Sequence, residues 1–105
     1  MNEILVLAGA DQDLFGHYCR LEERREGAGD KFDQAVNERL ELLRQNPFMA
    51  PAYLDLTTIR RLAILEWDVG LYYSVEGTRN VLHAVLHLRQ DKDTIRATLL
   101  SRLPQ

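Results

Sequence analysis

Two histidines and an arginine in one short apolar stretch are the residues of this sequence with the clearest capacity for chemistry. His83, His87 and Arg89 occupy odd positions of the segment 81–89, and the even positions between them are all apolar. Successive side chains of a β-strand point to opposite faces of the sheet. The pattern therefore predicts a strand with one apolar face and one polar face, as in an antiparallel sheet that is covered on one side.

A shared metal ion is the first chemistry that the two histidines suggest. The spacing H-x-x-x-H suits zinc on a helix, but on a strand four residues span about 13 Å. Because a zinc ion holds its nitrogen ligands at about 2.1 Å, His83 and His87 would share one ion only if the strand bulged. The sequence also contains no glycine-rich phosphate loop, nucleophile elbow or paired-carboxylate motif. We therefore expect no metal and no cofactor.

Anion binding is the second chemistry, because basic side chains are frequent in the second half of the chain. Guanidinium groups bind phosphate or carboxylate through paired hydrogen bonds, and the same groups can also serve only to solvate an open sheet face. Arg60 and Arg61 point to opposite faces of a predicted strand, so at most one shares a face with Arg89. Both interpretations stay open, and only His87 and Arg89 are candidates for a catalytic role. The basic set is Arg60, Arg61, Arg79, His87 and Arg89.

Three predicted strands between Ile59 and Arg89 position these side chains. The strands are separated by two short breaks, Trp67-Asp68 and Glu76-Gly77-Thr78. Glycine in the second break can take the positive φ that a tight hairpin needs. We expect an antiparallel meander, with everything before Ile59 packed onto it.

The first half of the chain predicts a strand and a helical hairpin. Residues 3–8 form the strand, and either Asp11 or Asp13 can cap the helix that follows. Asp30 is positioned to cap a second helix, which Asn46-Pro47 ends. Because the connection between the helices is short, we expect them to pair in antiparallel fashion.

The remaining segments complete the predicted fold. Residues 47–58 form a loop that leads into the meander, and residues 94–103 form a short final helix. The order is β-α-α-β-β-β-α, with the helices on one face of the sheet. This is an α+β two-layer sandwich, and we expect residues 1–105 to form one domain.

Composition and charge exclude several classes of function. The apolar run at residues 4–8 is too short for a signal peptide or a membrane span, and a single cysteine fits a reducing cytoplasm. The net charge is −5 over residues 1–55 and +2 over residues 56–105. This asymmetry is far from the balance of a nucleic-acid-binding protein. We expect a cytoplasmic protein that binds neither membranes nor, directly, nucleic acid.

Motifs along nearly the whole chain resemble the RelE/ParE toxin superfamily of bacterial type II toxin–antitoxin systems. The first are A-D-Q-D-L at residues 10–14 and F-x-x-A-V-x-x-x-L-x-x-L-x-x-x-P at residues 32–47. They continue with I-R-R-L at 59–62, G-L-Y-Y-S-V at 70–75 and V-L-H-L-R-Q-D at 85–91. Each motif is weak alone, but their order and spacing are fairly specific. The resemblance implies the same fold, a cognate antitoxin as partner and a role of the plasmid-stabilisation type.

The resemblance also implies a branch of the superfamily. In the mRNA-cleaving branch the catalytic set is lysines on the second strand, arginines on the third and fourth strands, and a tyrosine in the last helix. The matching positions here are Leu62, Ile64, Gly70, Arg89 and Ile95, and only Arg89 agrees with that set. The ParE branch, which is not enzymatic and is implicated in poisoning DNA gyrase, therefore fits better. The residues that match the family pattern or that could meet the target are Arg60, Arg61, His83, His87 and Arg89.

Three functions follow from the resemblance. The first is a ParE-like gyrase inhibitor. The second is a ribosome-dependent mRNA endonuclease that uses Arg89 with His83 or His87, and the third is a non-toxic binding module of the same fold. In each case we expect an extended antitoxin segment to bind the groove along the two helices or to add a strand to an open sheet edge. A homodimer is left open.

Overall fold

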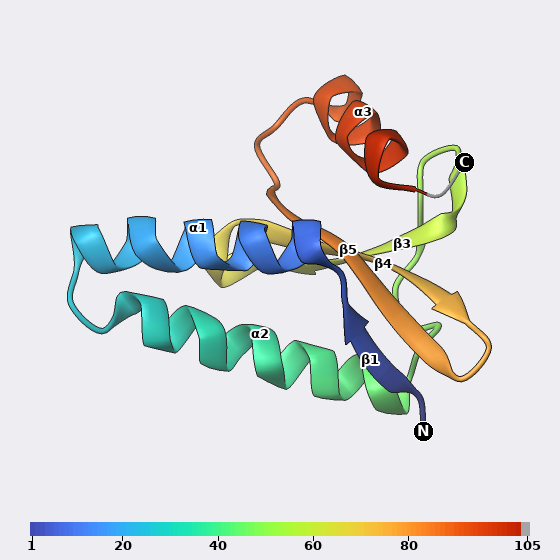
Figure 1. Ribbon diagram of the computed structural model, residues 1–105, viewed down its shortest axis with the longest axis horizontal. Helices are drawn as coiled ribbons and strands as arrows, with labels where there is room; N and C mark the ends of the chain where they lie inside the picture. The colour runs from blue at the N-terminus through green and yellow to red at the C-terminus, as the bar shows by residue number, and fades with distance from the viewer. Residues whose placement is uncertain (104–105) are drawn as a thin grey trace.

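A five-stranded mixed sheet is the centre of the computed structural model, which describes residues 1–103 (Figure 1). The strand order is β1-β5-β4-β3-β2. β1 pairs with β5 in parallel, and the other neighbours are antiparallel. The strands are β1 (Glu3–Val6), β2 (Ala52–Tyr53), β3 (Leu56–Ile64), β4 (Val69–Glu76) and β5 (Arg79–His87). Residues 104 and 105 of the predicted domain lie outside the described part.

The predicted meander is confirmed as β3, β4 and β5. A 3-10 turn, η1 (Leu65–Trp67), occupies the first predicted break together with Asp68, which has a φ of 57°. Gly77 occupies the second break with a φ of 62°, a conformation that glycine adopts at no steric cost. The predicted loop 47–58 is partly wrong, because β2 lies within it and β3 already begins at Leu56.

The helical hairpin consists of α1 (Ala8–Arg24) and α2 (Ala28–Gln45), which lie side by side in Figure 1. α2 ends directly before Asn46, as predicted. The predicted caps are wrong, because α1 begins three residues before Asp11 and the residue before α2 is Gly27. Gly27 has a φ of 85° and makes no side-chain cap, since it serves to reverse the chain between the helices.

The last strand contains a β-bulge that the sequence pattern did not predict. Tyr72 on β4 pairs with Ala84, whereas the next residue, Tyr73, pairs with Leu82, so His83 has no partner. An extra residue of this kind reverses the alternation of side chains beyond it. The prediction that residues 82, 84, 86 and 88 share one apolar face is therefore wrong. Leu82 packs with the helical hairpin, and Ala84 packs on the opposite face.

Helices cover both faces of the sheet, so the prediction that they lie on one face is also wrong. The hairpin covers one face through a core that includes Phe32, Leu43 and Leu82. On the other face, α3 (Lys92–Arg102) buries Ile95 and Leu99 against the strands. This second site for apolar burial exists because the bulge presents apolar side chains of β5 to both faces. The α+β class and the hairpin-on-sheet layering are confirmed.

Membrane insertion finds no support in the described helices. None of the helices within residues 1–103 is both long enough and apolar enough to span a bilayer.

Candidate functional site

The basic residues predicted from the sequence do not converge on one site. Arg61 lies over the ring of Tyr53, 5.1 Å from its centroid, on the side of the sheet that α3 covers. Arg60 instead reaches the loop before β2, where it donates a hydrogen bond to Ala50 O and lies 5.0 Å from the centroid of the Phe48 ring. The expectation that Arg60 and Arg61 point in different directions is met. Both guanidinium groups already contact other groups of the protein.

Arg89 and Arg79 are equally dispersed. Arg89 follows the end of β5, where its Nε lies 2.8 Å from a carboxylate oxygen of Asp68 and its side chain is 87% exposed. Arg79 begins the same strand, eight residues earlier than His87. Strand geometry separates those two positions by about 26 Å. The predicted basic set is therefore spread over the sheet, with no common anion site.

His83 and His87 lie on opposite faces of the sheet, because the bulge at His83 separates them. The Nε2 of His83 is 2.8 Å from the Ser74 hydroxyl, and the same hydroxyl is 2.8 Å from a carboxylate oxygen of Glu76. One serine proton satisfies both contacts only when Nε2–H donates to Ser74 and Ser74 donates to Glu76. Burial lowers the pKa of His83, and the charge of Glu76 partly opposes this. His83 is thus buried, and the sheet separates it from His87.

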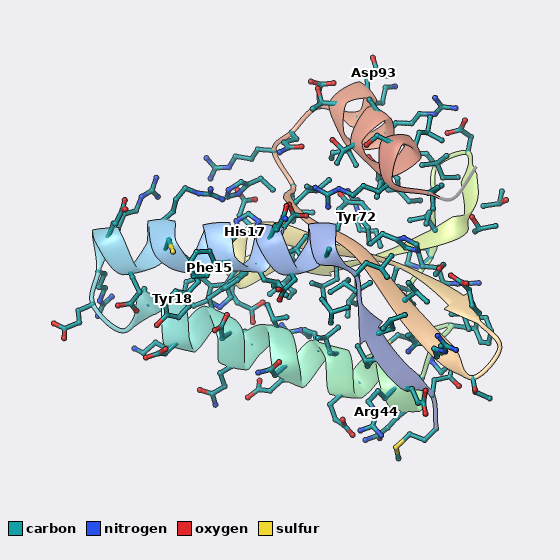
Figure 2. The ribbon with its side chains drawn as sticks, viewed as in Figure 1. Phe15, His17, Tyr18, Arg44, Tyr72 and Asp93 are labelled. Atoms are coloured by element: carbon teal, nitrogen blue, oxygen red, sulfur yellow. The ribbon has the colours of Figure 1, made fainter. Side chains whose placement is uncertain are left out.

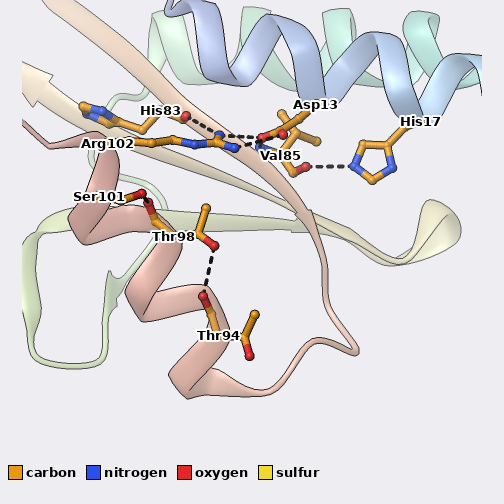
Figure 3. Close-up of polar contacts among 8 residues, drawn as sticks. All are labelled: Asp13, His17, His83, Val85, Thr94, Thr98, Ser101 and Arg102. Carbon is orange, nitrogen blue, oxygen red and sulfur yellow. Dashed lines mark hydrogen bonds and ion pairs between the residues drawn. The ribbon is translucent and has the colours of Figure 1, made fainter.

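His87 meets a histidine that the sequence analysis missed. The ring of His17, on α1, lies 4.8 Å from the ring of His87 at an interplanar angle of 85°. The Nε2–H of His17 donates to Val85 O at 2.8 Å (Figure 3). Arg20 donates to the Nδ1 of His17 at 2.8 Å. Burial, followed by the charges of His87 and Arg20, lowers the pKa of His17. The sequence could have indicated that His17 is buried, because it lies between Leu14 and Leu21 on the apolar stripe of α1.

A second unforeseen contact holds the three layers together beside the bulge. Asp13 of α1 accepts a hydrogen bond from Val85 N at 3.0 Å and pairs with Arg102 of α3 at 2.7 Å. Arg102 also donates to His83 O at 3.0 Å (Figure 3). β1 pairs with β5 only as far as Leu82, so these side chains satisfy backbone groups of β5 that have no neighbouring strand. Asp13, which was predicted to cap α1, has this role instead.

The four positions that depart from the catalytic set of the mRNA-cleaving branch lie mostly in the core. Ile64 is 0% exposed, Ile95 is 1% exposed, and Leu62 packs against the core below the hairpin. A side chain at Gly70 would begin 3.1 Å from atoms of Arg61. Three of these positions therefore hold apolar side chains that pack in or against the core. At the fourth, Gly70, the side chain of Arg61 fills the space.

A groove with a volume of about 550 Å³ lies between α1 and α2. Phe15 lines it and is 69% exposed, and Tyr18 donates a hydrogen bond to Asp30 across it at 2.9 Å. Both aromatic rings lie between the two helices in Figure 2. Asp11, Asp30 and Asp33 give the groove a negative charge, and burial and then the charge of Asp30 raise the pKa of Asp33. An apolar strip between carboxylates suits a basic amphipathic segment.

The close approach of the helices at one end of this groove depends on Gly29. A Cβ at this position would lie 2.7 Å from Cδ2 of Tyr18, well inside van der Waals contact. The backbone N–H of Gly29 also donates to the Glu22 carboxylate at 2.9 Å. The groove is therefore closed at the turn of the hairpin, where α2 begins.

Metal binding has no geometric basis in the described chain. Within residues 1–103, no three histidine, cysteine, aspartate or glutamate side chains are grouped closely enough to hold an ion. The two histidines that raised the question are directed to opposite faces. The bulge that would have been required for a shared ion is present, but it separates the rings instead of bringing them together.

Comparison with known proteins identifies the fold. No family model matches the chain, and no curated protein matches it. Among solved structures, the chain is similar to one from the chromosomal ParDE TA system from P. aeruginosa, with a TM-score of 0.73 and 18% sequence identity. The similarity covers 83% of this chain and 96% of that chain. The protein therefore has a RelE/ParE-like fold, as its sequence motifs predicted.

Proposed function

We propose that this protein is the toxin of a bacterial type II toxin–antitoxin system, and that it acts on DNA gyrase as a ParE-like inhibitor. The main support is the fold shared with a ParDE system chain over 96% of that chain's length. The ordered series of sequence motifs, which was found independently of the fold, supports the same conclusion. A target such as gyrase requires action in the cytoplasm. The free cysteine Cys19 agrees with this, because the cytoplasm is reducing.

Gyrase is preferred to messenger RNA as the target because of the residues at the nuclease positions. Ile64 and Ile95 are buried core residues, and neither can donate or accept a proton. Cleavage through a ribose hydroxyl requires acid–base groups and charge stabilisation at the phosphate. Among the nuclease positions only Arg89 carries a charge that could stabilise the phosphate, and this charge is paired with Asp68.

Induction of the protein in cells distinguishes the three functions. A gyrase inhibitor relaxes a reporter plasmid while transcripts stay intact, whereas an endonuclease cuts transcripts and leaves plasmid supercoiling unchanged. Normal growth with neither effect would favour the non-toxic binding module. We expect relaxed plasmid and intact transcripts, and cleaved transcripts with normal supercoiling would overturn the proposal.

The antitoxin segment is proposed to bind the groove between α1 and α2. Phe15 provides exposed apolar surface there, and Asp11, Asp30 and Asp33 provide complementary charge for lysine or arginine on the partner. A segment that folds on binding requires such an apolar anchor to offset its loss of conformational entropy. The partner is expected to be the product of a small neighbouring open reading frame.

Two exposed phenylalanines allow a matched test of this docking surface. Phe15 is 69% exposed and lies in the groove, and Phe48 is 65% exposed and lies in the loop before β2. Loss of an aromatic anchor weakens binding by about ten-fold or more, so Phe15→Ala should do so in isothermal titration calorimetry with the partner. Phe48→Ala should bind as the unmodified protein does. Equal losses in both variants, or no loss in Phe15→Ala, would contradict the assignment of the groove.

A further inference from the structure

A small cavity lies where the second half of α1 crosses the ends of β4 and β5. Its volume is about 60 Å³. Phe32 and Trp67 form an aromatic wall, with their rings 5.8 Å apart in an edge-to-face arrangement. The remaining lining residues are His17, Arg20, Leu21, Arg24, Val69 and His87.

The charge of this cavity is positive and is not neutralised by the protein. Arg20 and Arg24 lie one helical turn apart on α1, so that their side chains share one face of the helix. Neither arginine takes part in an ion pair within residues 1–103, and the described lining contains no acidic residue. This pair thus differs from Arg89 and Arg102, each of which has a carboxylate partner.

Two side chains that line the cavity, Arg20 and His87, have hydrogen-bonding nitrogens available for a ligand. Because His17 uses its Nε2–H for Val85 O, its Nδ1 accepts from Arg20, and this contact fixes one end of the Arg20 guanidinium. The other donors of that planar group make no hydrogen bond within residues 1–103, so they are available to a ligand. His87 makes no hydrogen bond through its ring within residues 1–103, so a ring nitrogen is available at the same place.

We propose that this cavity binds a phosphate group, with Arg20 and Arg24 as its charge partners and His87 as a hydrogen-bond donor. Two guanidinium groups and an imidazole beside an aromatic wall are suited to a tetrahedral oxyanion. The site is separate from the groove between α1 and α2, and it requires neither gyrase nor an antitoxin. It is therefore independent of the proposed function.

A neighbouring hollow indicates how an esterified phosphate would be accommodated. This hollow has a volume of about 190 Å³ and shares His17, Arg20 and His87 with the cavity. Its one acidic lining residue, Asp13, is already paired with Arg102. A phosphate monoester can therefore place its phosphate in the cavity and its substituent in the hollow, whereas free phosphate fills the cavity alone.

The only tryptophan of the chain reports on this cavity directly, because Trp67 lines it. The intrinsic fluorescence of the purified protein should change in a saturable manner when inorganic phosphate or ribose 5-phosphate is added at constant ionic strength. Tighter binding of the ester would assign the hollow to its substituent, and equal binding would show that the site recognises the phosphate group alone. The absence of a saturable change with either compound at millimolar concentration, relative to chloride, would overturn the proposal.

Arg24, the last residue of α1, and Arg25, which directly follows the helix, provide the variant and its control. Arg24→Gln removes one charge partner and should weaken phosphate binding about ten-fold, as expected for a charge-assisted hydrogen bond. Arg25→Gln removes the same charge one residue further on, outside the lining, and should bind phosphate as before. Circular dichroism confirms that both variants are folded. Equal affinity in the two variants would show that the fluorescence change does not arise from this site.

Discussion

At the scale of single residues, several side chains have contacts that differ from those expected from the sequence. His83, which the sequence suggested as an acid–base group, is buried in the bulge, where its Nε2 contacts the Ser74 hydroxyl. Asp13 does not cap α1, because its carboxylate binds Val85 N and Arg102. His17, which has no motif around it, also connects α1 to the end of β5.

The two buried histidines predict how stability depends on pH. Burial lowers the pKa of both His17 and His83 below the ordinary value of 6.5. The unfolded chain therefore takes up protons below that pH while the folded chain does not, so the free energy of unfolding should fall as the solution is acidified through 6.5. The slope is at most about 1.4 kcal/mol per pH unit for each histidine.

Urea unfolding between about pH 7.5 and 5.5 tests this dependence, since most carboxylates remain ionised over that range. In His83→Gln the slope should be reduced, because one of the two groups no longer takes up a proton on unfolding. The account would be contradicted if the unmodified protein were equally stable at both ends of the range, or more stable in acid.

At the scale of elements, the bulge in β5 determines how the helices are arranged. It presents Leu82 to the hairpin and Ala84 to α3, so that one strand serves two cores. The contact of Asp13 with Arg102 then joins α1 to α3 across the end of β1. α3 is thus held both by apolar burial of Ile95 and Leu99 and by one ion pair.

This ion pair predicts a difference between two arginines of α3. Arg102 and Asp13 have side chains only 26% and 17% exposed, so Arg102→Met should lower the free energy of unfolding by about 2 kcal/mol. Arg96 pairs with Asp55 at the surface, where solvent screens the pair, and Arg96→Met should change stability little. Urea unfolding of both variants measures the contrast. Similar losses in the two variants would show that Arg102 has no special role.

The elements differ in how far the sequence could predict them. Asn46-Pro47 and Gly77 ended their elements as predicted, because helix breaking and a positive φ are local properties of those residues. The bulge at His83 was not predictable from alternation, since it depends on what satisfies the strand edge beyond Leu82. The apolar face of α3 was also evident in the sequence, but periodicity does not state which side of a sheet a helix will cover.

At the scale of the whole molecule, the fold and the proposed function rest on different kinds of support. The fold follows from the sheet order, the hairpin and the similarity to a ParDE system chain. The candidate site was predicted less well, because Arg60, Arg61 and Arg89 shared a region of sequence but not a region of space. The groove between α1 and α2 depends on a close approach at Gly29 that no sequence pattern reveals.

The supercoiling activity of purified DNA gyrase in the presence of this protein tests the central claim most directly. We predict that micromolar protein inhibits supercoiling of a relaxed plasmid and that addition of the partner that binds the groove restores it. A catalytically inert carrier protein at the same concentration serves as the control. Gyrase that supercoils normally at micromolar concentrations of the folded protein would contradict the account.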